Sequence, residues 1–271
     1  MEKREIGLQD TLTLTRTSFY KTIQVKRVLI CFHGFMTSSW HDCTAFKKYF
    51  DSINDNPNFE VELVNLYTWG DKSTYSSKNF YKLAYEAVKK HIDKGEIVYL
   101  LSYSFSADLA ARLTCEFPQI EKLCLISPTT YIVKTKLLAS YISMAVKNLK
   151  LRLKYKRKAK KIIQKTKMDG IVRLAINIAK SIVKNRKYLK YVNCKVFMCK
   201  GNKDEFSISQ TFHYISRKSK NAIIMSKTYP DENHVMFCTL EHGLRVFQDV
   251  LRFTFHMKKV MEVEEGSEEE K

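Results

Sequence analysis

Residues 97–111 read IVYLLSYSFSADLAA. The first five residues form an unbroken apolar run, which is typical of a short parallel strand buried on both faces of a sheet. The alanine-rich residues that follow favour a helix, and Pro118 ends it. Small side chains allow such a helix to pack close to the sheet. The stretch therefore predicts a strand, a tight serine-rich turn and a helix.

Strands and helices alternate on both sides of this stretch. We expect strands at 11–16, 25–32, 59–66, 97–101, 120–126, 194–199 and 222–226, and helices at 79–93, 104–117, 207–218 and 239–257. Such alternation predicts an α/β fold with a mostly parallel sheet that is flanked by helices. A chain of 271 residues is long enough for one large domain of this kind with an insertion.

Ser104 is the central serine of the turn and our candidate nucleophile. A serine hydroxyl becomes nucleophilic when a base removes its proton, and a tight strand-to-helix turn exposes that hydroxyl above the sheet. The positions two before and two after such a serine are usually Gly, whereas this chain has Ser102 and Ser106 there. A solvated serine-rich turn is the alternative interpretation.

A base and an acid follow later in the chain. His234 comes after the strand at 222–226 and precedes the last helix, which suits a general base. Asp204 follows the strand at 194–199 and the turn at 201–203, where the loop aims its side chain at the carboxyl edge of the sheet. The nearby carboxylates that remain open as alternatives for the acid are Glu205, Asp231 and Glu232.

An upstream turn, His33-Gly34-Phe35, completes the set. The oxyanion formed during acyl transfer needs hydrogen-bond donors that are already in place. The main-chain N–H groups of Phe35 and Phe105 are the two candidates. Met36 and Trp40 are candidate substrate-binding residues on the wall of an acyl pocket, with ordinary core packing as the alternative.

These four segments resemble those of α/β-hydrolases, most of all the bacterial carboxylesterases and monoacylglycerol lipases. The resemblance covers roughly residues 20–128 and 194–257. It implies a serine hydrolase that cleaves carboxylic esters, with Ser104 as nucleophile, Asp204 as acid and His234 as base. It also implies a helical cap between the strands at 120–126 and 194–199, and no metal or organic cofactor.

Charge is concentrated in the inserted segment. Residues 129–193 hold 19 Lys or Arg and one acid, Asp169, which gives +18 of the chain's net charge of +19. Apolar residues at helical spacing predict that the segment is a basic helical cap, with Gly170 separating two of its helices. We therefore divide the chain into an α/β-hydrolase core at 1–128 and 194–259, the cap at 129–193 and an acidic, disordered tail at 260–271.

The basic cap suggests three kinds of partner. Attraction to an anionic membrane surface is one, and an anionic substrate such as a lysophospholipid or an acyl-CoA thioester is another. Nucleic acid is the weakest of the three, because aromatic residues for base stacking are sparse in the segment. Lysines that simply solvate a helix are the alternative.

The seven cysteines are odd in number and contain no CxxC spacing, so we expect reduced thiols. We interpret Cys238 as a small buried hydrophobic residue, with a place near the site, four residues after His234, as the alternative. A charged N-terminus and the lack of a long apolar run predict a cytoplasmic protein, at most peripheral at the inner membrane surface.

Two function classes stay open. One is an active esterase or lipase-like enzyme, with acyl thioesters as alternative substrates. The other is a weakly active, hydrolase-derived protein that binds anionic membrane.

Overall fold

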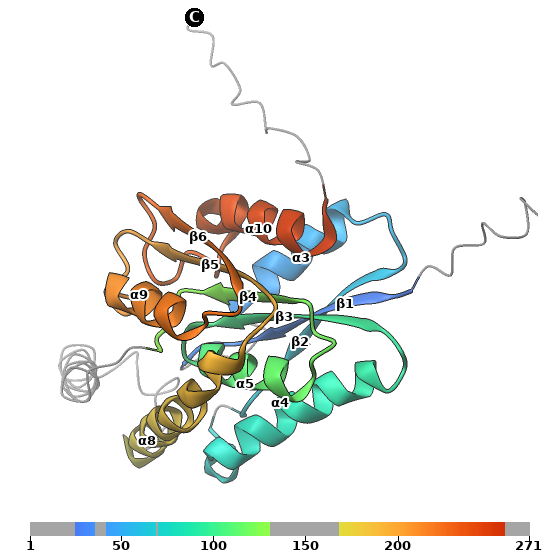
Figure 1. The fold of residues 1–271 in the computed structure, drawn as a ribbon. Helices are drawn as coiled ribbons and strands as arrows, with labels where there is room; N and C mark the ends of the chain where they lie inside the picture. Colours follow the sequence, from blue (N-terminus) through green and yellow to red (C-terminus); the bar gives the residue numbers. More distant parts are fainter. Residues whose placement is uncertain (1–24, 36–41, 69, 131–167, 258–271) are drawn as a thin grey trace, which may run out of the picture.

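The computed structural model describes residues 25–35, 42–68, 70–130 and 168–257 (Figure 1). Several predictions lie outside these residues: the strand at 11–16, the pocket residues Met36 and Trp40, most of the basic segment and the acidic tail. The division into core, cap and tail therefore stays a prediction.

A six-stranded sheet forms the centre of the described part of the chain. Its strand order is β2-β1-β3-β4-β5-β6, and every neighbouring pair is parallel. The carboxyl ends of all six strands therefore meet at one edge. The strands are β1 (Arg27–Phe32), β2 (Phe59–Val64), β3 (Ile97–Tyr103), β4 (Lys122–Ile126), β5 (Lys195–Gly201) and β6 (Ile223–Tyr229).

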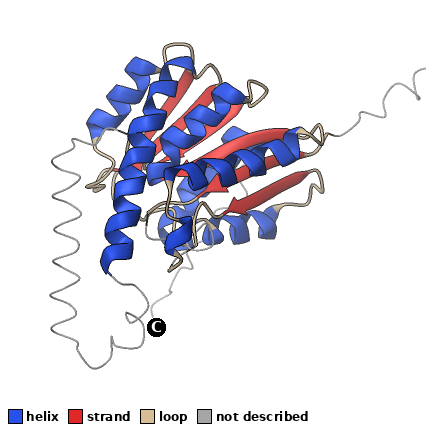
Figure 2. Ribbon diagram, turned by 90° about the horizontal axis from the view of Figure 1, so that it is seen from below, coloured by secondary structure: helices blue, strands red, loops and turns tan. Residues whose placement is uncertain are grey.

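Helices cover both faces of this sheet (Figures 1 and 2). One face carries α3 (Thr44–Ile53) and α10 (Leu240–Phe255). The other carries α4 (Ser77–Ile92), α5 (Ala107–Glu116), α8 (Met168–Asn185), the 3-10 helix η3 (Arg186–Tyr191) and α9 (Ser209–Lys218). Two further short 3-10 helices are η1 (Lys72–Thr74) and η2 (Ser104–Ser106).

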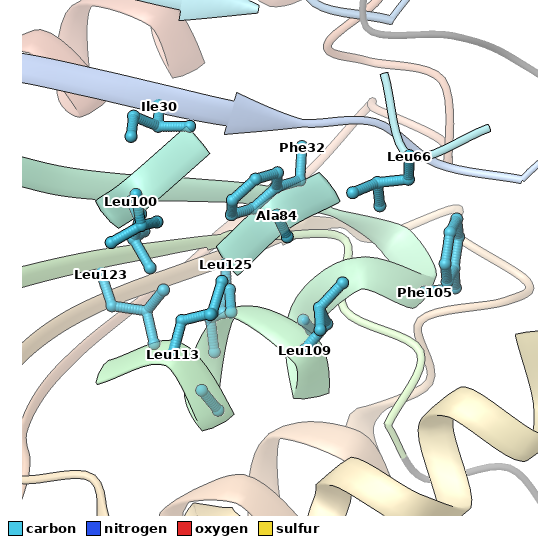
Figure 3. Packing of buried hydrophobic residues seen from close by; sticks show 14 of the residues in the cluster. Ile30, Phe32, Leu66, Ala84, Leu100, Phe105, Leu109, Leu113, Leu123 and Leu125 are labelled. Atoms are coloured by element: carbon cyan, nitrogen blue, oxygen red, sulfur yellow. The ribbon is translucent and has the colours of Figure 1, made fainter. Parts of the chain in front are cut away.

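Alternation along the strands builds two cores. Ile30 and Phe32 of β1 point into the core under α4 and α5, as Figure 3 shows, whereas Leu29 and Cys31 point into the core under α3 and α10. Each of these four side chains is fully buried. Burial on both faces explains why the strand sequences are continuously apolar and not alternating.

The expected strands and helices in the described residues are present, with shifted ends. β3 continues two residues beyond the expected end, to Tyr103, and the helix expected at 104–117 is divided into η2 and α5. Ala107, Ala110 and Ala111 of α5 are almost completely buried, which agrees with close packing on the sheet. α3 was not expected, because its sequence buries only Phe46 and Phe50 and its N-cap, Cys43, makes no side-chain capping bond.

The described C-terminal part of the basic segment, from residue 168 onward, is mostly helical. Leu174, Ile178 and Ile182 lie on one buried face of α8, as their spacing predicts. Gly170 lies inside the first turn of α8, so the prediction that it separates two helices is wrong. A Cβ atom at Gly170 would lie 3.3 Å from Lys72 Cε, so this part of α8 packs close against η1.

No helix in the part of the chain that the structure describes is long and apolar enough to cross a bilayer.

Candidate active site

A strained turn presents Ser104 at the carboxyl edge of the sheet. β3 ends at Tyr103, and η2 starts at Ser104, whose φ of 60° lies in the left-handed region. Non-glycine residues seldom adopt this conformation, and when they do they cluster at functional sites. α5 starts three residues later, directly after η2.

Serines fit at both flanking positions, because their hydroxyls bond to the main chain. The Ser106 hydroxyl lies 3.0 Å from the carbonyl oxygen of Tyr103 and 3.3 Å from that of Phe32, and it accepts the Tyr103 N–H at 3.2 Å. The Ser102 hydroxyl lies 3.5 Å from the carbonyl oxygen of Cys124. Both serines are fully buried. The turn therefore forms without the usual glycines.

Three side chains from distant segments meet at this turn. His234 Nε2 lies 3.1 Å from Ser104 Oγ, and His234 Nδ1 lies 2.9 Å from both carboxylate oxygens of Asp204. The Asp204 side chain is fully buried, whereas 19% of the His234 side chain is exposed. The acid is thus dry, and the imidazole borders solvent.

Main-chain donors hold the Asp204 carboxylate. The N–H groups of Phe206 and Ser207 donate to its Oδ1 at 2.8 and 2.7 Å. Burial by itself raises the pKa of Asp204. The bonds from His234 and from these two N–H groups lower the pKa by more than burial raises it, so the net shift is downward. Asp204 therefore stays ionised and able to orient the imidazole.

The other candidate acids lie elsewhere. Asp231 pairs with Lys203 at 3.3 Å, and Glu232 pairs with His242 at 3.4 Å. Glu205 is exposed. Of the four carboxylates that the sequence left open, Asp204 is the one in contact with His234.

The turn at 33–35 follows the end of β1, at the same carboxyl edge of the sheet. His33 is fully buried; its Nδ1 lies 2.8 Å from the carbonyl oxygen of Gly34, and its Nε2 accepts the Leu66 N–H at 2.9 Å. Burial lowers the pKa of His33 to about 4, so the ring is neutral and Nδ1 carries the proton. Tyr67 also donates to the Gly34 oxygen at 3.2 Å. Because a trans peptide is planar, fixing this oxygen also fixes the direction of the Phe35 N–H.

Phe105 supplies the second expected donor. It is the second residue of η2, and the N–H groups in the first turn of a helix have no partner within that helix. Phe105 itself is almost fully buried, with its ring 5.9 Å from that of Phe80. The structure therefore anchors the Phe105 side chain in the core under α4 while its main chain stays in the turn.

Sequence patterns missed several residues around the triad. Tyr103 donates a hydrogen bond to the main-chain oxygen of His234, and the Phe206 ring lies 5.0 Å from the imidazole. Cys238, which we interpreted as a simple buried hydrophobic residue, is only partly buried and contacts both Asp42 and Tyr103 through its thiol. Tyr103 and Phe206 could have been suspected, because they lie next to Ser104 and two residues after Asp204 in the sequence. No sequence pattern indicated that Asp42 lies near the site.

Within the described ranges, no group of three or more His, Cys, Asp or Glu side chains is arranged to hold a metal ion.

Comparison with solved structures identifies the fold. The chain resembles the structure reported for LipS and LipT, two metagenome-derived lipolytic enzymes, with a TM-score of 0.61 and 11% identity over 86% of this chain and 95% of that one. It resembles the esterase EaEST from Exiguobacterium antarcticum with a TM-score of 0.61 and 11% identity over 85% and 92% of the two chains. A thioesterase domain from the curacin biosynthetic pathway matches with a TM-score of 0.51 and 14% identity over 84% and 92%.

No protein-family model and no curated protein matches the sequence. The parallel sheet, its flanking helices and these structural neighbours confirm the expected class: the chain has the α/β-hydrolase fold. At these identities the likeness shows the fold alone.

Proposed function

We propose that this protein is a serine hydrolase that cleaves carboxylic esters through an acyl-enzyme intermediate. The observation that carries the proposal is the unbroken contact from Asp204 through His234 to Ser104, made on a turn where Ser104 adopts a positive φ. An ordinary serine-rich turn needs neither the strain nor the two partners. Its fold neighbours include lipolytic enzymes and an esterase, which supports ester-type substrates.

Each residue has a defined step in this reaction. Ser104 Oγ attacks the ester carbonyl carbon while His234 Nε2 takes the hydroxyl proton, and Asp204 stabilises the imidazolium that forms. The N–H groups of Phe35 and Phe105 stabilise the oxyanion, and each such donor lowers the activation free energy by on the order of 3 kcal/mol. His234 then gives its proton to the leaving alcohol.

The second half regenerates the enzyme. Water attacks the acyl carbon as His234 Nε2 removes one of its protons, and that proton returns to Ser104 Oγ when the carboxylic acid leaves. The same sequence of proton transfers serves an acyl thioester, with a thiol as the leaving group. Acyl thioesters are therefore the alternative substrates, a choice that the thioesterase neighbour supports.

The surroundings of His234 favour an apolar acyl group. Phe206, whose ring contacts the imidazole, is 48% exposed, and Val235 is 53% exposed. Exposed apolar side chains beside the proposed triad suit a medium or long acyl chain better than a charged acyl group. Met36 and Trp40 remain proposed as further pocket residues.

Turnover of p-nitrophenyl esters of graded chain length tests the proposal. Ser104→Ala is expected to abolish turnover. Ser127→Ala is a matched control, since Ser127 is also buried with a positive φ of 46° and its hydroxyl has no hydrogen-bond partner. Turnover by the control but not by Ser104→Ala supports the enzyme, whereas equal turnover by both variants overturns it.

The outer face of α8 supports the proposed contact with anionic membrane. Val172, Ile176 and Val183 are each about half exposed, and Lys180 lies on the same stripe. From Gly170 to Asn193 the chain has six Lys or Arg and no acid. Apolar side chains that alternate with cations suit the interface of an anionic bilayer.

Vesicle flotation tests this contact. We expect binding to vesicles that contain phosphatidylglycerol, weaker binding at high salt, and loss of binding in Val172→Glu/Ile176→Glu. Ile223→Glu is the control, because Ile223 is 66% exposed on the distant edge strand β6. Equal binding to anionic and neutral vesicles contradicts the proposal. Membrane binding without ester turnover would favour the alternative of a hydrolase-derived binding protein.

All seven cysteines are free thiols, which supports our proposal that the protein acts in a reducing compartment such as the cytoplasm.

A further inference from the structure

A chain of buried polar groups lies directly behind the candidate active site. The Gly34 N–H donates to Asp42 Oδ2 at 2.5 Å. The Cys238 thiol lies 3.8 Å from Asp42 Oδ1 and 3.9 Å from the Tyr103 hydroxyl oxygen. That hydroxyl in turn donates to the main-chain oxygen of His234. The chain thus runs from the turn that holds Phe35 to the loop that holds the imidazole.

The members of this chain come from four separate segments. Gly34 follows β1, Asp42 precedes α3, Tyr103 ends β3, and Cys238 lies in the turn between His234 and α10. Asp42 is fully buried and Tyr103 is 3% exposed. Polar contacts between separate segments in the protein interior help to fix the distance between those segments.

The Tyr103 ring adds shape to the same connection. A Cβ atom at position 34 would fall 2.8 Å from Tyr103 Cδ1, so only glycine lets the ring lie this close to the turn. On its other side the ring lies 5.5 Å from the imidazole of His234. One side chain therefore touches both halves of the catalytic machinery.

The protonation states suit the bonds. Burial, with the charge of Asp42 as a smaller cause, raises the pKa of the Cys238 thiol to about 12, so the thiol stays protonated and able to donate. Burial also raises the pKa of Tyr103 far above its usual value, and its hydroxyl keeps the proton that it donates to His234. The thiol and the phenol therefore both keep their protons across the physiological pH range.

We propose that Tyr103, Cys238 and Asp42 are positioning residues that hold the Gly34-Phe35 turn and the His234 loop at the spacing that acyl transfer needs. The inference rests on the proposed hydrolase function. The Tyr103 hydroxyl acts on the main-chain oxygen of His234. The Asp42 carboxylate acts on the N–H of Gly34, the residue before Phe35. None of the three touches the reacting atoms.

Tyr103→Phe tests this role, because it removes only the hydroxyl. We expect kcat to fall about 10-fold with KM little changed, and labelling of Ser104 by a fluorophosphonate to slow by a similar factor. Tyr99→Phe is the matched control, since Tyr99 is a buried tyrosine on the same strand and the same face, four residues earlier. The control should keep the wild-type kcat.

Cys238 gives an independent arm. Cys238→Ala is expected to lower kcat, and Cys238→Ser, which keeps a donor, should restore part of the loss. In the double variant Tyr103→Phe/Cys238→Ala the two effects should be less than additive, because both break one chain.

Three results separate the possible failures. Wild-type kcat in folded Tyr103→Phe, with active wild type, overturns the positioning role and leaves the hydrolase proposal intact. A lower melting temperature with unchanged kcat and unchanged labelling rate also overturns it, since that pattern is purely structural. If the wild type itself neither turns over esters nor reacts with the fluorophosphonate, the proposed function fails, and the positioning role fails with it.

Discussion

Gly201 lies directly against the main chain of Glu232. A Cβ atom at Gly201 would fall 2.1 Å from the Glu232 carbonyl oxygen and 2.3 Å from its carbonyl carbon. The neighbouring Lys203 N–H donates to that same oxygen at 2.9 Å. The loop that ends at Asp204 and the loop that leads to His234 are therefore held together, main chain against main chain.

Gly201→Ala should separate these two loops. Overpacking against rigid backbone destabilises a fold by about 1–3 kcal/mol, and displacement of the acid from the imidazole by about 1 Å can lower kcat roughly 100-fold. Denaturant unfolding and ester turnover measure the two effects. Gly170→Ala is the control, because its Cβ would meet the flexible end of Lys72 and not backbone. Equal loss of activity in both variants would contradict the loop contact.

Ser106→Gly restores the residue that is usual after such a nucleophile. We expect the variant to retain activity, because the turn is formed by the main chain of η2, and to lose about 1–2 kcal/mol of stability. The loss has two causes: the hydroxyl bonds to Tyr103 and Phe32 disappear, and glycine is more flexible in the unfolded chain. Ser106→Ala should show the first loss only. An increase in the stability of Ser106→Gly would contradict this account.

Asp108, four residues after Ser104, makes the stability of the protein depend on pH. Burial raises the pKa of its carboxyl group from 3.8 to about 8. Neither carboxylate oxygen has a partner within hydrogen-bond distance, so the nearby Thr130 hydroxyl and Arg186 charge offset the effect of burial only in part. Below pH 4 the group is protonated in both the folded and unfolded states. Between pH 4 and 8 the unfolded chain releases the proton while the folded chain keeps it, so stability falls as pH rises.

Asp108→Asn removes this dependence. We expect the variant to match the wild type at pH 4 and to exceed it by on the order of 2–5 kcal/mol at pH 8. Because all other titrating groups are common to both proteins, the difference between their unfolding curves isolates Asp108. A stability difference that stays constant from pH 4 to pH 8 would show that Asp108 ionises normally in the folded state.

The sheet could be predicted from the sequence, because burial on both faces makes the interiors of β1, β3 and β4 apolar. The candidate triad was chosen from side chains that lie just beyond strand ends, as Ser104 does after β3, and its catalytic role stays a prediction. The sequence favoured Asp204 over its acidic neighbours by its place after β5, and packing puts its carboxylate in contact with the imidazole of His234. α3 was missed because an amphipathic helix with two buried phenylalanines leaves a weak pattern.

The positioning residues could not be predicted from local patterns. Asp42 and Cys238 are 196 residues apart, and although Cys238 is close to His234 in the sequence, no pattern connects it with Asp42. Gly170 was wrongly predicted to separate two helices, because glycine lowers helix propensity without excluding a helix, and Gly170 lies within α8. Long-range contacts of this kind follow from the topology of the sheet and not from spacing along the chain.

Fluorophosphonate labelling followed by peptide mass analysis tests whether Ser104 is an activated nucleophile. We expect one covalent adduct, on Ser104, in the wild type. We expect no adduct in Ser104→Ala and greatly slowed labelling in His234→Ala, in which the serine keeps its place but loses its base. Labelling of Ser104→Ala to the wild-type extent, or an unreactive Ser104 in folded wild-type protein, would contradict the claim.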